Sequence, residues 1–297
     1  MTGIGTPDLA GERASGRRRF DIRGLSPRSY VIVSFLMVLV IWEIAARTLG
    51  TSRATGATII PDITTTLSAF IAYSNYWVGG LGAGDTRMGA DETWWGAVLG
   101  LGYNLGITLL RLAGGLAVGV VLGVGIGFVI SWSGLLRSLL SFPAHFLRMM
   151  PLLALVPLFA MWFSNKNVGS IFFVAIAVFV LMFAATLNAV RNAPPYQVQF
   201  ARSLGASAAF VYFRVVFPSI LPELRSGILL SLGFSWNATL ASEFLGQRYG
   251  LGAIVMIAQE FGRMDLIMLS ALICIVGASL SFALADRLFS WLVRWAE

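Results

Sequence analysis

The amino-acid sequence predicts an all-α protein that crosses a membrane about six times. Hydrophobic residues make up 57% of its 297 residues, charged residues make up only 12%, and the mean hydropathy is +0.80. Soluble domains do not have this composition. Apolar runs of about 20 residues recur, and a helix needs this length to cross the hydrocarbon core. Arginines stand at the ends of these runs, so the net charge of +7 indicates membrane topology rather than nucleic-acid binding.

Six runs are long enough to be spans, at residues 30–49, 104–131, 141–163, 168–190, 222–245 and 265–291. With the N-terminus in the cytoplasm, most arginines fall on the cytoplasmic side, as the positive-inside rule requires. The C-terminus is then cytoplasmic as well. Residues 1–29 are expected to form a cytoplasmic tail, residues 30–103 the first span and an external segment, and residues 104–297 the core.

The external segment has two parts. The first, TIIPDITTTLSAFIAY, is typical of a short amphipathic helix, and the second, GGLGAGDTRMGADETWWG, is typical of a glycine-rich loop. Two roles for this insertion, at residues 75–97, stay open. It either docks an external partner or is a surface loop without a special role, because external loops vary freely.

The second run carries four glycines at intervals of four residues: Gly115, Gly119, Gly123 and Gly127. This spacing places them on one face of a helix. Because a glycine face lets another helix backbone approach closely, we expect a helix contact there. The partner helix can belong to the same chain or to a second copy.

A basic, punctuated segment at residues 196–222 separates two apolar blocks. Pro194 and Pro195 end the preceding helix and favour the start of a short one, from about Tyr196 to Leu204. Gly205 follows where a left-handed helix cap is expected. Further on, apolar residues recur at helical spacing. Two prolines are then expected to break the chain before the next span: Pro218 and Pro222.

This segment resembles the cytoplasmic signature of the membrane subunits of binding-protein-dependent ATP-driven importers. The signature reads Glu-Ala-Ala, three residues, Gly, nine residues, Ile, one residue, Leu-Pro. Three positions match outright: Ala201, Gly205 and Pro218. Two are apolar replacements: Val215 and Phe217. Two depart, although the first still offers hydrogen bonds: Gln199 and Phe200. The flanking text RSLGAS, PLLALVPLFAMWF and ASEFLG…GLG is similar to the nitrate, sulfonate and taurine branch.

The resemblance, which covers roughly residues 104–295, implies a type I permease subunit of an ABC importer in the cell membrane. It implies a homodimer, two cytoplasmic ATPase subunits that bind ATP and Mg, and an extracytoplasmic solute-binding protein. The solute would be a small organic anion. A coupling helix near residues 194–208 would contact the ATPase, through these residues: Gln199, Phe200, Ala201, Arg202, Leu204, Gly205, Ala206, Val215, Phe217 and Pro218.

The chain itself is not expected to be an enzyme. A phosphate-binding loop ends in Lys-Ser or Lys-Thr, whereas the only lysine, Lys166, lies between Asn165 and Asn167. One cysteine, Cys274, and one histidine, His145, do not make a metal-ligand cluster. ATP hydrolysis is therefore expected on a separate polypeptide.

Polar residues inside the spans are candidates for lining a solute path, because such groups usually face protein or water. Five are expected to do so: Arg111, Arg148, Trp236, Asn237 and Glu243. The alternatives are that Arg111 reaches the outer headgroups and that Arg148 and Glu243 form structural pairs.

Two other functions remain open at this point. An ion-coupled secondary transporter would use Glu243 or His145 as its coupling residue. A membrane scaffold without transport would use neither.

Overall fold

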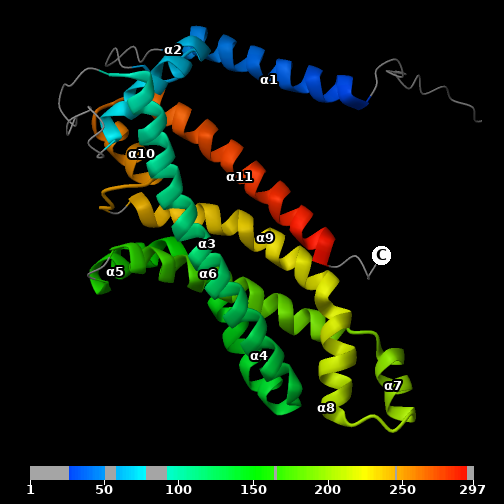
Figure 1. Cartoon of the computed structure of the whole chain (residues 1–297). Coiled ribbons are helices and arrows are strands. Elements are labelled where there is room, and N and C mark those ends of the chain that lie inside the picture. The colour runs from blue at the N-terminus through cyan, green and yellow to red at the C-terminus, as the bar shows by residue number, and fades with distance from the viewer. Residues whose placement is uncertain (1–26, 51–57, 78–91, 164–165, 245, 293–297) are drawn as a thin grey trace, which may run out of the picture.

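The computed structural model describes residues 27–50, 58–77, 92–163, 166–244 and 246–292. The described residues fold into helices joined by short turns, so the predicted all-α fold is confirmed (Figure 1). Five helices are long and apolar enough to cross a membrane. They are α1 (Pro27–Leu49), α3 (Trp94–Trp132), α6 (Lys166–Asn192), α9 (Phe217–Phe244) and α11 (Met264–Leu292).

Shorter elements connect the long helices. On one side of α3 lie α2 (Ile63–Ser68) and the 3-10 helix η1 (Ala69–Tyr76), which confirm the short helix predicted in the external segment. Residues 78–91, which hold most of the glycine-rich loop, lie outside the described part. The remaining elements are α4 (Gly134–Met149), α5 (Leu152–Trp162), α7 (Pro195–Ser203), α8 (Ala208–Val211), the π-helical turn η2 (Tyr212–Val216) and α10 (Leu251–Glu260).

The core is the packing of α3, α6 and α9 against one another. The four glycines of α3 are buried against α6. A Cβ added at Gly119 would lie 2.6 Å from the Cβ of Val178, and one added at Gly123 would lie 2.6 Å from the Cβ of Met182. Real Cβ atoms do not approach so closely, so these two helices need glycine there. The contact lies within one chain.

The expected third span at 141–163 is not one helix. It is divided into α4 and α5, with a break at Met150 and Pro151. Pro151 has no N–H to donate to the preceding turn and disfavours helical backbone at Met150. Pro143 and Pro157, by contrast, lie inside α4 and α5 without ending them.

The expected break at Pro218 and Pro222 is also wrong. The helical backbone runs from α8 through η2 into α9, and Pro222 lies inside α9. In η2 the N–H of Phe217 bonds to the carbonyl of Tyr212, five residues earlier. This wider turn relieves the contact that the ring of Pro218 would make with the turn before it. Residues 208–244 therefore form one continuous helical run.

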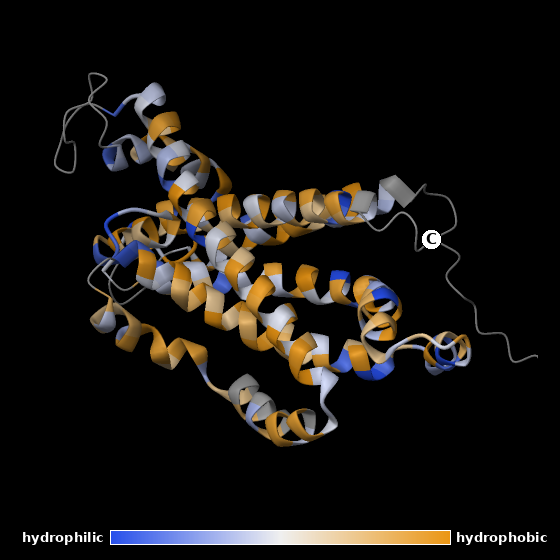
Figure 2. Cartoon of the chain, turned by 60° about the horizontal axis from the view of Figure 1, so that its bottom comes forward, coloured by the Kyte–Doolittle hydropathy of each residue, from blue (hydrophilic) through white to orange (hydrophobic). Residues whose placement is uncertain are grey.

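The two ends of the bundle differ. Figure 1 shows α7, α8 and the C-terminal end of α11 toward one end, and α2, α5 and α10 toward the other. In Figure 2 the apolar residues lie along the long helices and the hydrophilic ones gather near helix ends. Most large apolar side chains of α1 are exposed, as expected for a helix that faces lipid.

Candidate functional site

The segment that was predicted to be cytoplasmic forms what we call the coupling surface, residues 195–216. As predicted, α7 begins at Pro195 and ends before a left-handed Gly205, whose φ is +79°. The N–H of Ala206 donates to the carbonyl of Ala201 (3.1 Å), and the N–H of Gly205 donates to that of Arg202 (2.9 Å). This is the double hydrogen bond of a Schellman cap. The cap turns the chain back toward α8.

A Cβ at Gly205 would meet no atom within 4 Å. The glycine is thus required by its backbone conformation and not by close packing.

The coupling surface is apolar and open. Five large side chains on it are more than half exposed: Tyr196, Phe200, Leu204, Phe210 and Phe213. A groove of about 490 Å³ lies between α7 and α8, lined by Phe200, Ala201, Leu204, Gly205, Ala206, Ser207 and Phe210. Soluble surfaces rarely expose such a cluster unless a partner covers it.

The base of the coupling surface is anchored to α3. Tyr212 donates a hydrogen bond to the carbonyl of Phe128 and stacks on its ring, with 4.2 Å between ring centroids. Phe217 packs on the same ring at 5.1 Å. The signature positions therefore divide into two groups. Gln199, Phe200, Arg202, Leu204 and Gly205 are exposed, whereas Ala201, Ala206, Val215, Phe217 and Pro218 are partly buried.

The charge of the coupling surface is positive. Arg202 and Arg214 are exposed, and neither forms an ion pair with any residue that the structure describes. Between Arg191 and Glu223 the sequence has no acidic residue. Among the described residues, these two arginines therefore have no acidic partner.

A second constellation, which we call the outer polar cluster, lies at the opposite end. Nη1 of Arg111 is 2.7 Å from Oε1 of Glu243, and the two side chains are 4% and 0% exposed. Arg111 also donates to the carbonyl of Tyr249 (2.8 Å), to Oδ1 of Asn167 (2.6 and 3.1 Å) and to Gln247. Its donors thus join α3, α6 and the turn after α9.

The carboxylate of Glu243 has three hydrogen-bond donors around it. It accepts hydrogen bonds from Thr108 Oγ1, from Arg111 and from the N–H of Gly252 (2.9 Å). Gly250 has a φ of +119°, and a Cβ there would lie 2.5 Å from the carboxyl carbon of Glu243. The N–H groups of Gly250 and Leu251 donate to the side chains of Asn104 and Thr108, respectively. The sequence ASEFLG…GLG thus contains both the buried carboxylate of Glu243 and the glycine turn that holds it.

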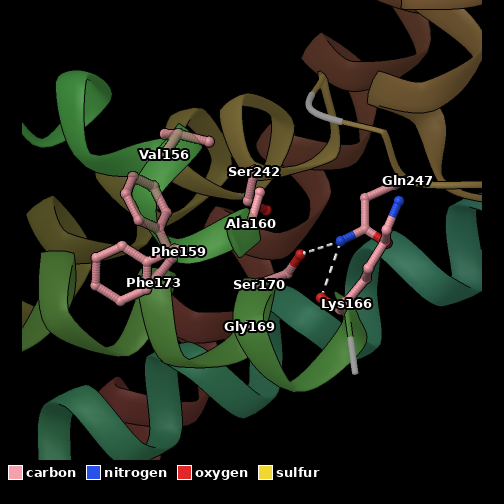
Figure 3. A pocket seen from close by; sticks show the side chains of 9 residues that line it. All are labelled: Val156, Phe159, Ala160, Lys166, Gly169, Ser170, Phe173, Ser242 and Gln247. Carbon is pink, nitrogen blue, oxygen red and sulfur yellow. Dashed lines mark hydrogen bonds between the residues drawn. The ribbon is translucent and has the colours of Figure 1, made fainter. Parts of the chain in front are cut away.

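A small cavity borders this cluster (Figure 3). Its volume is about 20 Å³, room for about one water molecule. Gln247 crosses its polar side, donating to Ser170 Oγ (2.7 Å) and to the carbonyl of Lys166 (2.9 Å). Val156, Phe159 and Phe173 form the apolar side. The cavity is too small for an organic solute.

The five path candidates do not form one group. Arg111 and Glu243 form a buried ion pair, so the alternative in which Arg111 reaches the outer headgroups does not hold, and Glu243 has the structural partner that its own alternative expected. Trp236 is buried and donates to Ser281 Oγ (2.9 Å). Asn237 is exposed on α9. Arg148 lies on α4, as does His145, but their side chains lie outside the described part.

Sequence reasoning missed the uncharged members of the outer polar cluster: Asn104, Thr108, Asn167 and Gln247. No charge or spacing distinguishes them from other polar residues. Their hydrogen bonds to Arg111, Glu243 and the glycine turn become visible only in the fold.

Comparison with known proteins gives the family. The family described as "Binding-protein-dependent transport system inner membrane component" matches residues 115–297. The taurine transport system permease protein TauC of Escherichia coli is 31% identical over 205 residues, covering 68% of this chain and 72% of the relative. The bicarbonate transport system permease protein CmpB of Synechococcus elongatus is 29% identical over 197 residues, covering 66% of this chain and 69% of the relative.

The putative aliphatic sulfonates transport permease protein SsuC of Bacillus subtilis is 29% identical over 192 residues, covering 65% of this chain and 70% of the relative. Among solved structures, the inward-facing MetNI methionine ABC transporter has a TM-score of 0.53 at 18% identity, covering 62% of this chain and 91% of that one. This likeness shows the fold. The chain belongs to the family of inner-membrane components of binding-protein-dependent transport systems, and it is a permease subunit of an ABC importer.

Proposed function

We propose that this chain imports a small oxyanion, of the sulfonate or bicarbonate class, as a homodimer driven by two cytoplasmic ATPase subunits. Relatives are named for taurine, aliphatic sulfonates and bicarbonate, which share a compact group of charged oxygens. The observation that carries the proposal is the coupling surface, where exposed apolar side chains and the family signature coincide. An exposed apolar surface of this kind usually marks a site where a partner protein binds.

The ATPase subunits and the binding protein have separate roles in the proposed complex. The two ATPase subunits hold ATP and Mg, and this chain adds no phosphate-binding loop to them. An extracytoplasmic binding protein delivers the solute to the outer face. The coupling surface and both termini lie in the cytoplasm. The arginine distribution supports this orientation, and so does the position of the C-terminal end of α11 toward the same end as α7 (Figure 1).

Closure of the ATPases moves the coupling surface, and two routes carry this motion into the membrane. The first is the continuous helix from α8 through η2 into α9. The second is the stacked contact of Tyr212 with Phe128, which lies near the cytoplasmic end of α3. Because α3 and α9 meet at the outer polar cluster, that cluster keeps their outer ends together while the inner ends move. Alternating access follows from this difference between the two ends.

The test is uptake by the reconstituted complex. The permease, its ATPase and its binding protein are placed in proteoliposomes, and uptake of taurine, an alkanesulfonate and bicarbonate is measured with and without ATP. We expect uptake of one of these anions that requires ATP and the binding protein. Uptake driven by an ion gradient without ATP would instead support a secondary transporter. Glu243 does not suit the role of coupling residue in a secondary transporter, because its side chain is fully buried and a coupling ion could not reach it.

A further inference from the structure

One polar side chain in the membrane-spanning part stands apart from the outer polar cluster. Asn237 lies on α9, seven residues before its last residue, Phe244. This places it roughly 10 Å below the outer end of the helix, at 1.5 Å per residue. Its Nδ2 donates to the carbonyl of Gly233 (3.1 Å), and its Oδ1 accepts no hydrogen bond from any described residue. The side chain is exposed in the single chain.

The neighbours of Asn237 on the same face are also open. Leu230 and Phe234 are at least half exposed, and a Cβ added at Gly233 would meet no atom within 4 Å. A primary amide that faces lipid loses its hydrogen bonds to water, which is costly in hydrocarbon. This face of α9 therefore lies against water or against protein in the assembled membrane complex.

A second, independent observation concerns the helix that packs next to α9. The helical run from α4 to α5 is broken at Met150 and Pro151, and Met149 beside the break is 83% exposed. Backbone that is not helical is tolerated at membrane depth only where protein buries it or where it lines a water-filled cavity. The helix that follows the break packs on α9, since Val156 and Ala238 belong to one core cluster. Two features that lipid does not tolerate thus lie on adjoining helices.

Neither of the two charged candidates whose side chains the structure describes serves this face. Arg111 and Glu243 are buried and their hydrogen-bonding groups are occupied by each other and by their neighbours. We propose that Asn237 lines the solute path and donates its amide N–H to the oxyanion as it passes, once from each copy of the chain. A neutral amide suits this role, because conduction needs binding that is weak enough for the solute to leave. This assignment rests on the proposed function, since it names part of the path that the importer opens.

Water access gives the first test. Cys274 is the only cysteine, so a Cys274→Ser chain that still transports provides a cysteine-free background. Asn237→Cys is compared with Ala271→Cys, which is also exposed and lies seven residues from the outer end of α11. Both complexes, with ATPase bound, are placed in nanodiscs and treated with a charged methanethiosulfonate reagent. Because the reagent attacks the thiolate, which forms in water, we expect modification of Asn237→Cys and none of Ala271→Cys. Equal rates, or no reaction at Asn237→Cys, would overturn the proposal.

Transport gives the second test. Asn237→Leu is expected to lower uptake by about tenfold or more, the effect of losing a hydrogen bond to a charged group, while Asn237→Ser keeps more of it. Yield of the assembled complex should equal that of the unsubstituted chain for both. If Asn237→Leu instead prevents assembly, Asn237 is a contact between the two copies and the path assignment is wrong.

The outcomes also separate this proposal from the proposed function. Absence of ATP-driven uptake by the unsubstituted complex contradicts the proposed function, and the thiol labelling then still reports whether water reaches Asn237. Normal uptake by Asn237→Leu in a working importer contradicts the assignment of Asn237 alone.

Discussion

The outer polar cluster and the coupling surface treat charge in opposite ways. In the cluster, Arg111 and Glu243 are buried and fully paired. On the coupling surface, Arg202 and Arg214 are exposed and unpaired among the described residues, beside apolar side chains that are equally exposed. The difference teaches that the outer polar cluster is complete within one chain, whereas the coupling surface has the features of a surface that a partner covers. Substitutions at the two ends should therefore fail in different assays.

The largest effect is expected from Arg111→Met. It leaves the carboxylate of Glu243 buried without its cation, which costs about 3–5 kcal/mol. The free energy of unfolding of the permease in detergent measures this loss. Arg263→Met is the matched control, because its ion pair with Asp265 is partly exposed and such pairs contribute less than about 1 kcal/mol. Arg111→Met combined with Glu243→Gln should recover part of the stability. Equal stability of Arg111→Met and Arg263→Met would show that the outer polar cluster does not hold the fold.

The next largest effect on stability is expected at the glycine face of α3, where it packs on α6. Gly119→Ala places a Cβ 2.6 Å from Val178 and should destabilise the permease by about 1–3 kcal/mol through overpacking. Gly125→Ala, on the open side of the same helix, meets no atom within 4 Å. It should be neutral or stabilising by up to about 1 kcal/mol, since alanine favours helix more than glycine does. Thermal unfolding of the two variants separates them. Identical shifts would remove the special role of the glycine face.

The smallest effect on stability is expected at the coupling surface. Phe200→Ser should change the free energy of unfolding by no more than about 0.5 kcal/mol, because the side chain is exposed. Binding of the ATPase should weaken by about tenfold or more, as for a central aromatic residue of an interface. Ala209→Ser, exposed on α8 outside the groove, is the control. Unchanged affinity of purified ATPase for Phe200→Ser would place the contact elsewhere.

The sequence predicted the helices and the glycine cap of α7 because their signals are local. Apolar length, the two prolines before α7 and the glycine after it each act within a few residues. Pairing between Arg111 and Glu243 spans 132 residues, and no local pattern connects them. Each was recognised as a polar group in a span, but not as the partner of the other.

The effect of a proline on a helix could not be predicted from the sequence either. Pro151 ends a helix whereas Pro157 and Pro222 lie inside helices. Whether a proline breaks a helix depends on how the freed carbonyl is satisfied and on the packing around it, and these belong to the tertiary structure.

One pair of variants at Gly205 tests most directly whether the coupling surface is the ATPase contact. Valine is strained at a φ of +79° by about 1–2 kcal/mol, whereas asparagine tolerates this conformation. The measurement is the molar ratio of ATPase to permease in the affinity-purified complex. We predict a ratio near that of the unsubstituted chain for Gly205→Asn and a strongly reduced ratio for Gly205→Val, with solute uptake falling in parallel. A normal ratio and normal uptake for Gly205→Val would contradict the account.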